Sequence, residues 1–302
     1  MRIIFAGSPD FSVPVLKSLH ENHSVCLVIT QPDRPSGRGK KLTACEVKQC
    51  ALKLGLKVHQ PESINNEHSR QLIREQNADI MIVAAYGQII PLDILQMTKL
   101  HAWNIHASIL PRWRGASPIE HAILHADKMT GISIMKMERG MDTGPVIHSE
   151  TIEVGIMNRI QLTKALSQLA VPAILNGIDS IIENKNLSVQ DDKEVTYAPK
   201  IKKDSFRIDW LLTAEQILCK ILAFHPYCYF EYKGHTIRIL DCEVVDINNV
   251  PGSVVVADQN KLIIAANQQA ILIKELQLSG KKAISWKSFY NGHPDLFTVK
   301  DA

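Results

Sequence analysis

The first half of the chain alternates short apolar runs with segments of helical periodicity. A helical segment from about residue 43 to residue 54 separates two of these runs. The runs that we expect to be strands are residues 2–6, 25–30, 80–85 and 102–105. Continuous apolar strands separated by helices predict a mostly parallel sheet that is covered on both faces. The first half is therefore expected to form an α/β domain.

Polar or glycine-containing turns follow three of the predicted strands, at residues 7–9, 86–87 and 104–111. Ligands of parallel sheets bind beyond the carboxyl ends of the strands, so we expect these turns to meet at one edge of the sheet. The first turn lacks the G-x-G-x-x-G spacing of dinucleotide-binding proteins. A nicotinamide or flavin site therefore has little support.

The next part of the chain predicts two strands around a glycine-rich turn, followed by a long helix. The strands are expected at residues 132–137 and 146–154, the turn at 139–145, and the helix from 159 to about 182. Residues 184–206 are polar and charged and are the best candidate for a linker. We therefore assign residues 1–183 to a first domain and residues 184–206 to a linker.

In the last part of the chain the apolar pattern changes to a period of two. Thr213 and Gln216 make a capping box for one short helix, which is expected to end near Ala223. Short strands follow at residues 227–232, 236–245, 253–257, 262–265 and 270–278. So many short strands, punctuated by glycine and proline, predict a small barrel or sandwich over residues 207–302.

The composition is that of an ordinary globular protein. The chain has 302 residues, 45% of them hydrophobic and 22% charged, which fits one large or two ordinary domains. Its six cysteines show neither C-x-x-C nor zinc spacing, so we predict reduced thiols and no metal site. The N-terminus lacks a charged leader with an apolar core, and the longest apolar run is too short to span a bilayer. We expect a cytoplasmic protein without membrane contact.

The net charge of +3 does not by itself indicate a nucleic-acid-binding protein, but the charge is concentrated. Residues 31–41 set one acid, Asp33, against the bases Arg34, Arg38, Lys40 and Lys41. Prolines and glycines in this segment exclude a regular helix or a central strand. A mobile basic loop at the carboxyl end of a strand suits contact with a phosphate backbone. The alternative is a solvated surface loop.

An amide and an imidazole stand two residues apart, at Asn104 and His106. If the segment is a strand, both side chains point to the same face. An amide that can polarise a carbonyl, beside a base that titrates near neutrality, suits acyl or formyl transfer. A histidine near an apolar strand is more often a core residue, and this alternative stays open. Asp142 lies in the glycine-rich turn, where it either approaches His106 or serves the turn alone.

These motifs together resemble the methionyl-tRNA formyltransferase family, and the resemblance covers nearly the whole chain. The similar segments are FAGSPDF at residues 5–11, QPDRPSGRGKKL at 31–42, AAYGQIIP at 84–91, NIHASILPRWRG at 104–115, MDTG at 141–144, RIDW at 207–210 and GKKA at 280–283. The resemblance implies a Rossmann-like formyltransferase domain with a mostly parallel sheet, followed by a small C-terminal β-barrel similar to an OB fold. It also implies 10-formyltetrahydrofolate as the formyl donor and the amino group of methionine on initiator tRNA as the acceptor.

The resemblance also assigns roles to residues. The catalytic residues carry over to Asn104, His106 and Asp142. The folate site carries over to Ser108, Ile109, Leu110 and Pro111, with Tyr86, Gly87 and Ile89 of a nearby loop. The tRNA contacts of the basic segment carry over to Arg34, Arg38, Lys40 and Lys41. Ala107 replaces a usual glycine and Ile109 a usual leucine, and both changes leave the polar groups in place. No metal is expected, because the carbonyl of the donor is already activated.

Two other interpretations remain. A formyltransferase acting on another amine, such as glycinamide ribonucleotide or an amino-sugar nucleotide, would share the Asn104, His106 and Asp142 set. The basic segment and the added barrel favour tRNA over these amines. A non-catalytic RNA-binding protein would not need all three catalytic residues. We expect a monomer, since one chain supplies both domains that the tRNA needs.

Overall fold

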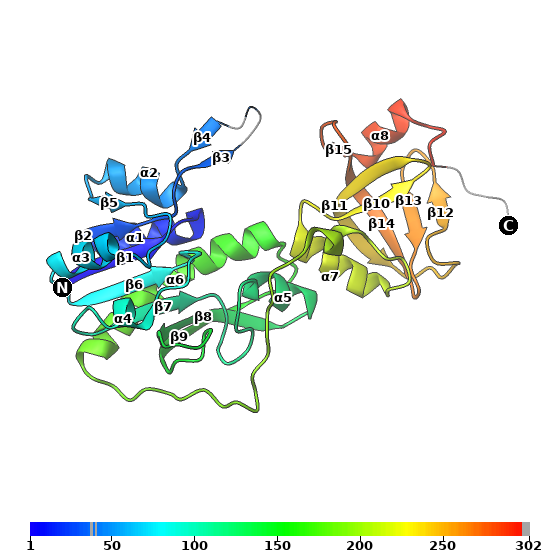
Figure 1. The fold of residues 1–302 in the computed structure, drawn as a ribbon. Helices are drawn as coiled ribbons and strands as arrows, with labels where there is room; N and C mark the ends of the chain where they lie inside the picture. Colours follow the sequence, from blue (N-terminus) through cyan, green and yellow to red (C-terminus); the bar gives the residue numbers. More distant parts are fainter. Residues whose placement is uncertain (37–38, 40, 298–302) are drawn as a thin grey trace. The chain divides into compact units, whose positions relative to one another are not determined.

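The computed structural model describes residues 1–36, 39 and 41–297 (Figure 1). The chain forms two compact units. The first unit consists of Met1–Pro118, Met129–Glu153 and Thr163–Pro199. The second consists of Ile119–Lys128, Val154–Leu162 and the chain from Lys200 onward.

The first unit is built on a sheet that has seven strands in the described part of the chain, in the order β5-β2-β1-β6-β7-β8-β9. The strands are β1 (Arg2–Gly7), β2 (Ser24–Ile29), β5 (Val58–His59), β6 (Ile80–Ala84), β7 (Ala102–His106), β8 (Met129–Lys136) and β9 (Val146–Glu153). The strands from β5 to β7 are parallel, whereas β8 and β9 are antiparallel to their neighbours. The prediction of a mostly parallel sheet is confirmed.

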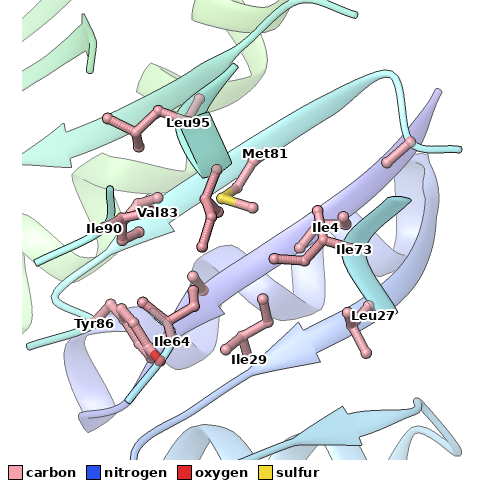
Figure 2. Close-up of a cluster of buried hydrophobic side chains, with 14 residues drawn as sticks. Ile4, Leu27, Ile29, Ile64, Ile73, Met81, Val83, Tyr86, Ile90 and Leu95 are labelled. Atoms are coloured by element: carbon pink, nitrogen blue, oxygen red, sulfur yellow. The ribbon is translucent and has the colours of Figure 1, made fainter. Parts of the chain in front are cut away.

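Helices pack on the apolar faces of this sheet. They are α1 (Val13–Asn22), α2 (Glu46–Lys53), α3 (Glu67–Glu75), α4 (Leu92–Leu95) and α6 (Arg159–Ile182), with the 3-10 turn η1 (Asp10–Ser12) before α1. Figure 2 shows one face, where Ile4 of β1 and Met81 of β6 lie with Ile73 of α3 and Leu95 of α4 in a buried cluster. Both faces of β1 are buried, which explains its uninterrupted apolar sequence.

Helix α6 has the bounds that the sequence predicts. Among the described helices it alone is long and apolar enough, by length and composition, to cross a membrane. Leu166, Ala170, Ile174 and Ile178 on this helix are fully buried, and the Ser167 hydroxyl donates a hydrogen bond to the carbonyl of Phe11 at 2.7 Å. Its apolar composition is therefore that of a helix packed in the protein core.

The second unit contains an antiparallel sheet with the strand order β10-β11-β14-β13-β12, to which β15 adds by pairing with β14. The elements are α5 (Pro118–Leu124), η2 (Lys203–Phe206), α7 (Ala214–Phe224), β10 (Tyr229–Tyr232), β11 (His235–Val245), β12 (Val254–Ala257), β13 (Leu262–Ala265), β14 (Ala270–Leu278), β15 (Ile284–Ser285) and α8 (Trp286–Gly292). The β11–β14 and β12–β13 pairs contain register shifts, and because such irregularities bend strands, the sheet is curled. This sheet is consistent with the expected OB-like domain, and the predicted capping box of α7 is present.

The structure differs from the sequence prediction in the basic segment. Arg34–Ser36 (β3) and Lys41–Thr43 (β4) pair as a two-stranded antiparallel ribbon, where only a loop was expected. An isolated ribbon tolerates Pro35, because most of its backbone groups need no second neighbouring strand. Helix α2 consequently begins at Glu46 rather than near residue 43. Arg38 and Lys40 lie outside the described residues.

Candidate active site

The carboxyl ends of β1, β6 and β7 meet at one edge of the first sheet, as predicted. Gly7 lies opposite Ala84, and a Cβ on Gly7 would collide with the Ala84 carbonyl, so this close approach requires glycine. The Ser8 hydroxyl donates to the carbonyl of Tyr86 at 3.2 Å and accepts from the backbone N–H of Gln31 at 3.1 Å. These hydrogen bonds join the turns that follow β1, β2 and β6, which are neighbours in the sheet.

Asn104 and His106 both lie on β7, two residues apart, so their side chains share one face of the strand. No residue in the described part of the chain makes a hydrogen bond with the half-buried side-chain amide of Asn104, which leaves this amide available to a substrate. His106 is only 5% exposed, and its Nε2 lies 2.9 Å from the carbonyl oxygen of Trp113. Because a carbonyl can only accept, Nε2 carries a proton and donates it to this bond.

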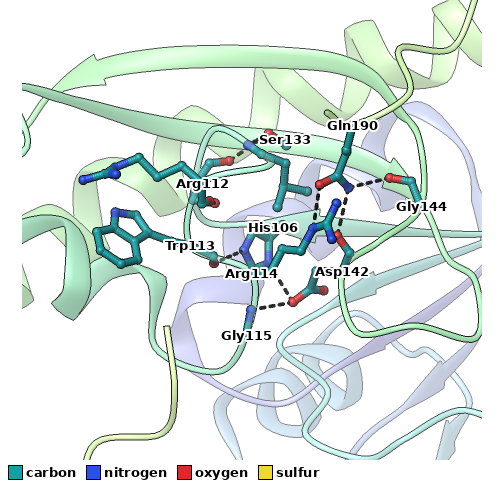
Figure 3. A network of polar contacts seen from close by, with 11 residues as sticks. His106, Arg112, Trp113, Arg114, Gly115, Ser133, Asp142, Gly144 and Gln190 are labelled. Carbon is teal, nitrogen blue, oxygen red and sulfur yellow. Dashed lines mark hydrogen bonds and ion pairs between the residues drawn. The ribbon is translucent and has the colours of Figure 1, made fainter. Parts of the chain in front are cut away.

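The other ring nitrogen of His106 faces Asp142, as Figure 3 shows. Its Nδ1 lies 3.7 Å from Oδ2 of Asp142, which belongs to the turn between β8 and β9. The same carboxylate oxygen accepts a hydrogen bond from the backbone N–H of Gly115 at 2.9 Å. Asp142 has a φ of +53°, in the left-handed region, which aspartate tolerates better than most residues. The structure therefore brings the imidazole and the carboxylate together across 36 residues of sequence.

Ser108 does not present its hydroxyl to the site. The residue is fully buried, and its Oγ donates to the carbonyl of Arg112 at 2.5 Å. Ser133 of β8 holds the same loop, because its hydroxyl donates to the carbonyl of Ser108 at 2.8 Å and accepts from the N–H of Leu110 at 3.1 Å. Ser108 thus shapes the loop from within. The contribution of Ser133 was missed, since a single serine in an apolar strand gives no signal in the sequence.

The remaining residues of this loop contribute apolar surface. Ile109 packs so close to Gly131 that a Cβ on this glycine would collide with it. Leu110 and Pro111 line a cleft of about 400 Å³, whose other walls come from β9 and from residues 186–194. These two side chains are placed to contact an apolar part of a ligand.

The loop after β6 has one buried and two exposed candidate residues, namely Tyr86 in the core and Gly87 and Ile89 on the surface. The ring of Tyr86 is 2% exposed and lies in the buried cluster of Figure 2. Burial raises the pKa of its phenol to about 12, and its hydroxyl has no hydrogen-bond partner among the described residues. Ile89 is 93% exposed, and Gly87 is exposed with a φ of +84°. The tyrosine ring is therefore a core group, and only its neighbours are open to a ligand.

We expect Tyr86→Phe to leave folate use unchanged. The substitution removes a buried hydroxyl without a partner, so the free energy of unfolding should stay equal or rise by up to about 1 kcal/mol. Steady-state kinetics with the formyl donor and thermal unfolding would measure both effects. A clear increase in the KM for the donor would instead mean that the phenol contacts the folate.

The basic ribbon places its described cations in solvent. Arg34 is exposed and lies 4.0 Å from Glu62, and Lys41 is also exposed. Asp33, the one acid in the segment, makes its hydrogen bonds with residues outside the ribbon. Gln60 and Lys48 both donate to its carboxylate and hold its pKa below the usual value. The positive charge of the ribbon is therefore little reduced by its own acid.

No group of three or more His, Cys, Asp or Glu side chains that could hold a metal ion occurs among the described residues. The six cysteines form no disulfide in the structure. Burial raises the pKa of the Cys228 and Cys242 thiols to about 12, so both remain protonated at neutral pH. These thiols are structural rather than reactive.

Residues 1–174 match the model of the formyl transferase family, and residues 200–294 match that of the formyl transferase C-terminal domain. The methionyl-tRNA formyltransferase of Neisseria meningitidis is 42% identical over 299 residues, which cover 97% of each chain. That of Pseudoalteromonas translucida is 40% identical over 307 residues, covering 99% of this chain and 96% of the relative.

The chain belongs to the methionyl-tRNA formyltransferase family. Its match to solved structures extends beyond this family. An N-formyltransferase from Helicobacter canadensis, in complex with folinic acid and dTDP-3-aminofucose, has a TM-score of 0.66 at 17% identity and covers 90% of this chain and 98% of its own. HypX from Aquifex aeolicus in complex with tetrahydrofolic acid has a TM-score of 0.64 at 15% identity, covering 99% of this chain and 48% of its own. At these identities the likeness shows that the methionyl-tRNA formyltransferases share their fold with other proteins.

Proposed function

We propose that the protein transfers the formyl group of 10-formyltetrahydrofolate to the α-amino group of methionyl initiator tRNA, for translation initiation. Membership of the family over nearly the full length supports this function. The observation that carries the chemistry is the His106–Asp142 pair. On the same strand face as His106 lies the Asn104 amide, which has no hydrogen-bond partner among the described residues. These are the groups that a carbonyl under attack by an amine requires.

Asn104 stabilises the charge that develops on the formyl oxygen. The neutral α-amine attacks the formyl carbon, and the electron pair of the C=O bond moves to oxygen. The amide N–H of Asn104 donates to this oxygen, a role worth roughly 3–4 kcal/mol for one donor. The oxygen's electron pair then re-forms the C=O bond while the bond between the formyl carbon and the folate nitrogen breaks, and the pair of that broken bond goes to the nitrogen.

His106 moves protons by way of Nδ1, because Nε2 is engaged by the carbonyl of Trp113. The attacking amine loses a proton and the departing folate nitrogen gains one, so a single group can accept the first and supply the second. Asp142 orients the ring by facing the same nitrogen, and the N–H of Gly115 fixes the carboxylate. Leu110, Pro111, Gly87 and Ile89 provide surface for the folate.

The two domains divide the work in this proposal. Residues 1–183 carry the chemistry and residues 207–302 contact the tRNA. Residues 184–206 lead from one domain to the other, and their part up to Pro199 belongs to the first unit. The basic segment at residues 31–41 supplies phosphate contacts through Arg34, Arg38, Lys40 and Lys41, and the exposed Lys281, Lys282 and Lys287 supply further ones. We place the enzyme in the cytoplasm and expect it to act as a monomer.

One assay tests the function. The purified protein is mixed with 10-formyltetrahydrofolate and offered charged methionyl initiator tRNA, glycinamide ribonucleotide, an amino-sugar nucleotide or no acceptor. We expect formyl transfer to the tRNA alone. Transfer to one of the small amines would assign a different acceptor, and no transfer to any of them would contradict the proposal.

Removing one cation from the basic ribbon should weaken tRNA use in a salt-dependent way. We expect Lys41→Ala to raise the KM for tRNA and to lower the slope of log affinity against log salt by about one, because one phosphate contact is lost. The exposed Lys57 offers a matched control, since Lys57→Ala removes the same charge from the surface elsewhere in the first unit. Equal salt slopes in the two variants would mean that the ribbon is only solvated surface.

A further inference from the structure

A segment of the first unit that the sequence shows only as a polar connection runs across the active site. We call residues 188–198 the strap. Ser188 pairs with Val146 at the start of β9, and Tyr197 forms a bridge with Arg114 beyond the end of β7. The strap therefore lies against the two chain segments that carry Asp142 and the neighbours of His106.

Gln190 of the strap holds the backbone of the Asp142 turn (Figure 3). Its side-chain Nε2 donates to the carbonyl of Asp142 at 2.8 Å and to the carbonyl of Gly144 at 2.6 Å. Gln190 is 8% exposed, so water competes little for these bonds. Both N–H groups of one amide are used to fix the two carbonyls that flank Thr143.

Arg114 determines which way this amide points. Arg114 is only 4% exposed, and its Nε donates to Oε1 of Gln190 at 2.9 Å. Because the guanidinium has only donors, the amide oxygen must face it and the amide nitrogen must face the turn. Arg114 thus selects the amide orientation that serves the Asp142 turn.

The strap also fixes the segment that holds His106. The backbone N–H of Arg114 donates to the carbonyl of Thr196 at 2.9 Å, and its carbonyl accepts from Ala198 at 2.8 Å. The N–H of Trp113 donates to the Thr196 hydroxyl at 2.9 Å. This segment supplies the Trp113 carbonyl to His106 and the Gly115 N–H to Asp142. One strap consequently secures the partners of both members of the pair.

We infer that Gln190 is a positioning residue for formyl transfer, acting through Asp142 and itself oriented by Arg114. Asp142 has a left-handed backbone conformation, so its carboxylate keeps its place opposite His106 only while that turn is held. Loss of the two Gln190 bonds lets the turn relax and moves Oδ2 away from Nδ1. A misplacement of about 1 Å at a reacting group costs on the order of 10²-fold in rate. This inference rests on the proposed function.

Gln190→Glu isolates this role. The carboxylate still accepts from Arg114 but has no N–H for the two carbonyls of the turn. We expect kcat to fall by about 10- to 100-fold. This is the usual effect of removing a residue that does not touch the substrate but holds a group that does. KM for the tRNA and for the donor should stay within about two-fold, since the Gln190 amide is engaged by Arg114 and by the carbonyls of the Asp142 turn. Tyr197→Phe, on an exposed residue of the same strap outside the cleft, should leave kcat and both KM values unchanged.

A double-mutant cycle separates positioning from a general loss of stability. If Gln190 acts through Asp142, then Gln190→Glu should cause little further loss of kcat in the Asp142→Asn background. A full additional loss in that background would overturn the inference, as would an unchanged kcat in the single variant. Thermal unfolding of each variant verifies that the folded protein is being assayed.

Hydrogen exchange provides a readout that needs no activity. We expect the backbone amides of residues 139–145 to exchange faster in Gln190→Glu than in the wild type, with those of β1 and β6 unchanged. If the wild-type protein fails to formylate the tRNA, the proposed function fails, while this measurement still tests the link from Gln190 to the turn. Unchanged exchange in residues 139–145 would remove the link itself.

Discussion

Substituting His106 by alanine, or Asp142 by asparagine, should remove most formyl transfer and leave tRNA binding intact. His106→Ala deletes the group that carries protons between the amine and the folate nitrogen, so we expect kcat to fall by about 10²–10⁴-fold. Asp142→Asn keeps the shape of the side chain and removes the charge that faces Nδ1 across 3.7 Å. Neither residue belongs to the basic ribbon, so the affinity for tRNA should not change.

Single-turnover formylation and a filter-binding titration of the tRNA would measure the two effects separately. His68→Ala provides the control, because this exposed histidine lies in the same unit away from the site. Near-normal turnover in either active-site variant would refute the assignment of the pair. A parallel loss of tRNA affinity would point instead to a role in binding.

Asn104→Ala should lower kcat by about 10²–10³-fold, the usual cost of one lost donor to an oxyanion. Asn104 is held in place by β7, and its side chain makes no hydrogen bond with any residue that the structure describes, so its truncation breaks no internal bond. The protein should therefore keep its stability. KM for the tRNA should remain close to that of the wild type.

Asn104→Asp is the sharper variant for this role. Aspartate has nearly the same shape, but its carboxylate only accepts hydrogen bonds and repels a developing negative charge. We expect it to be at least as inactive as Asn104→Ala, measured by the same steady-state assay. Activity well above that of the alanine variant would mean that Asn104 acts through shape and not as a donor.

The positions of the longer strands follow closely from the apolar pattern. Strand β1 could be recognised because a parallel strand buried on both faces needs a continuous apolar run, and β13 and β14 have the predicted bounds. The spacing of Asn104 and His106 predicts a shared strand face on geometric grounds alone. The approach of Asp142 to His106 depended on the family resemblance, since its turn is separated from β7 in sequence.

Other features depend on tertiary contacts that no local pattern encodes. Gln190 lies 48 residues from the carbonyl that it holds, within a segment whose polarity is typical of a connection. The core position of the Tyr86 ring depends on Ile64 and Ile90 around it. Helix α3 escaped prediction although Asn66 caps it by accepting from the N–H of Ser69. Its sequence is mostly polar, so only one narrow apolar stripe marks it as a helix.

The bond between His106 Nε2 and the Trp113 carbonyl limits the imidazole to a single entrance for protons. An imidazole with both nitrogens free can act as a proton relay, because it can accept a proton at one nitrogen and donate one from the other. In this protein the same Nδ1 must accept the proton of the amine and then donate a proton to the folate nitrogen. The attacking amine and the departing folate nitrogen must therefore both lie within reach of this one ring nitrogen. Bulk water has no second route through the ring by which to exchange the proton in between.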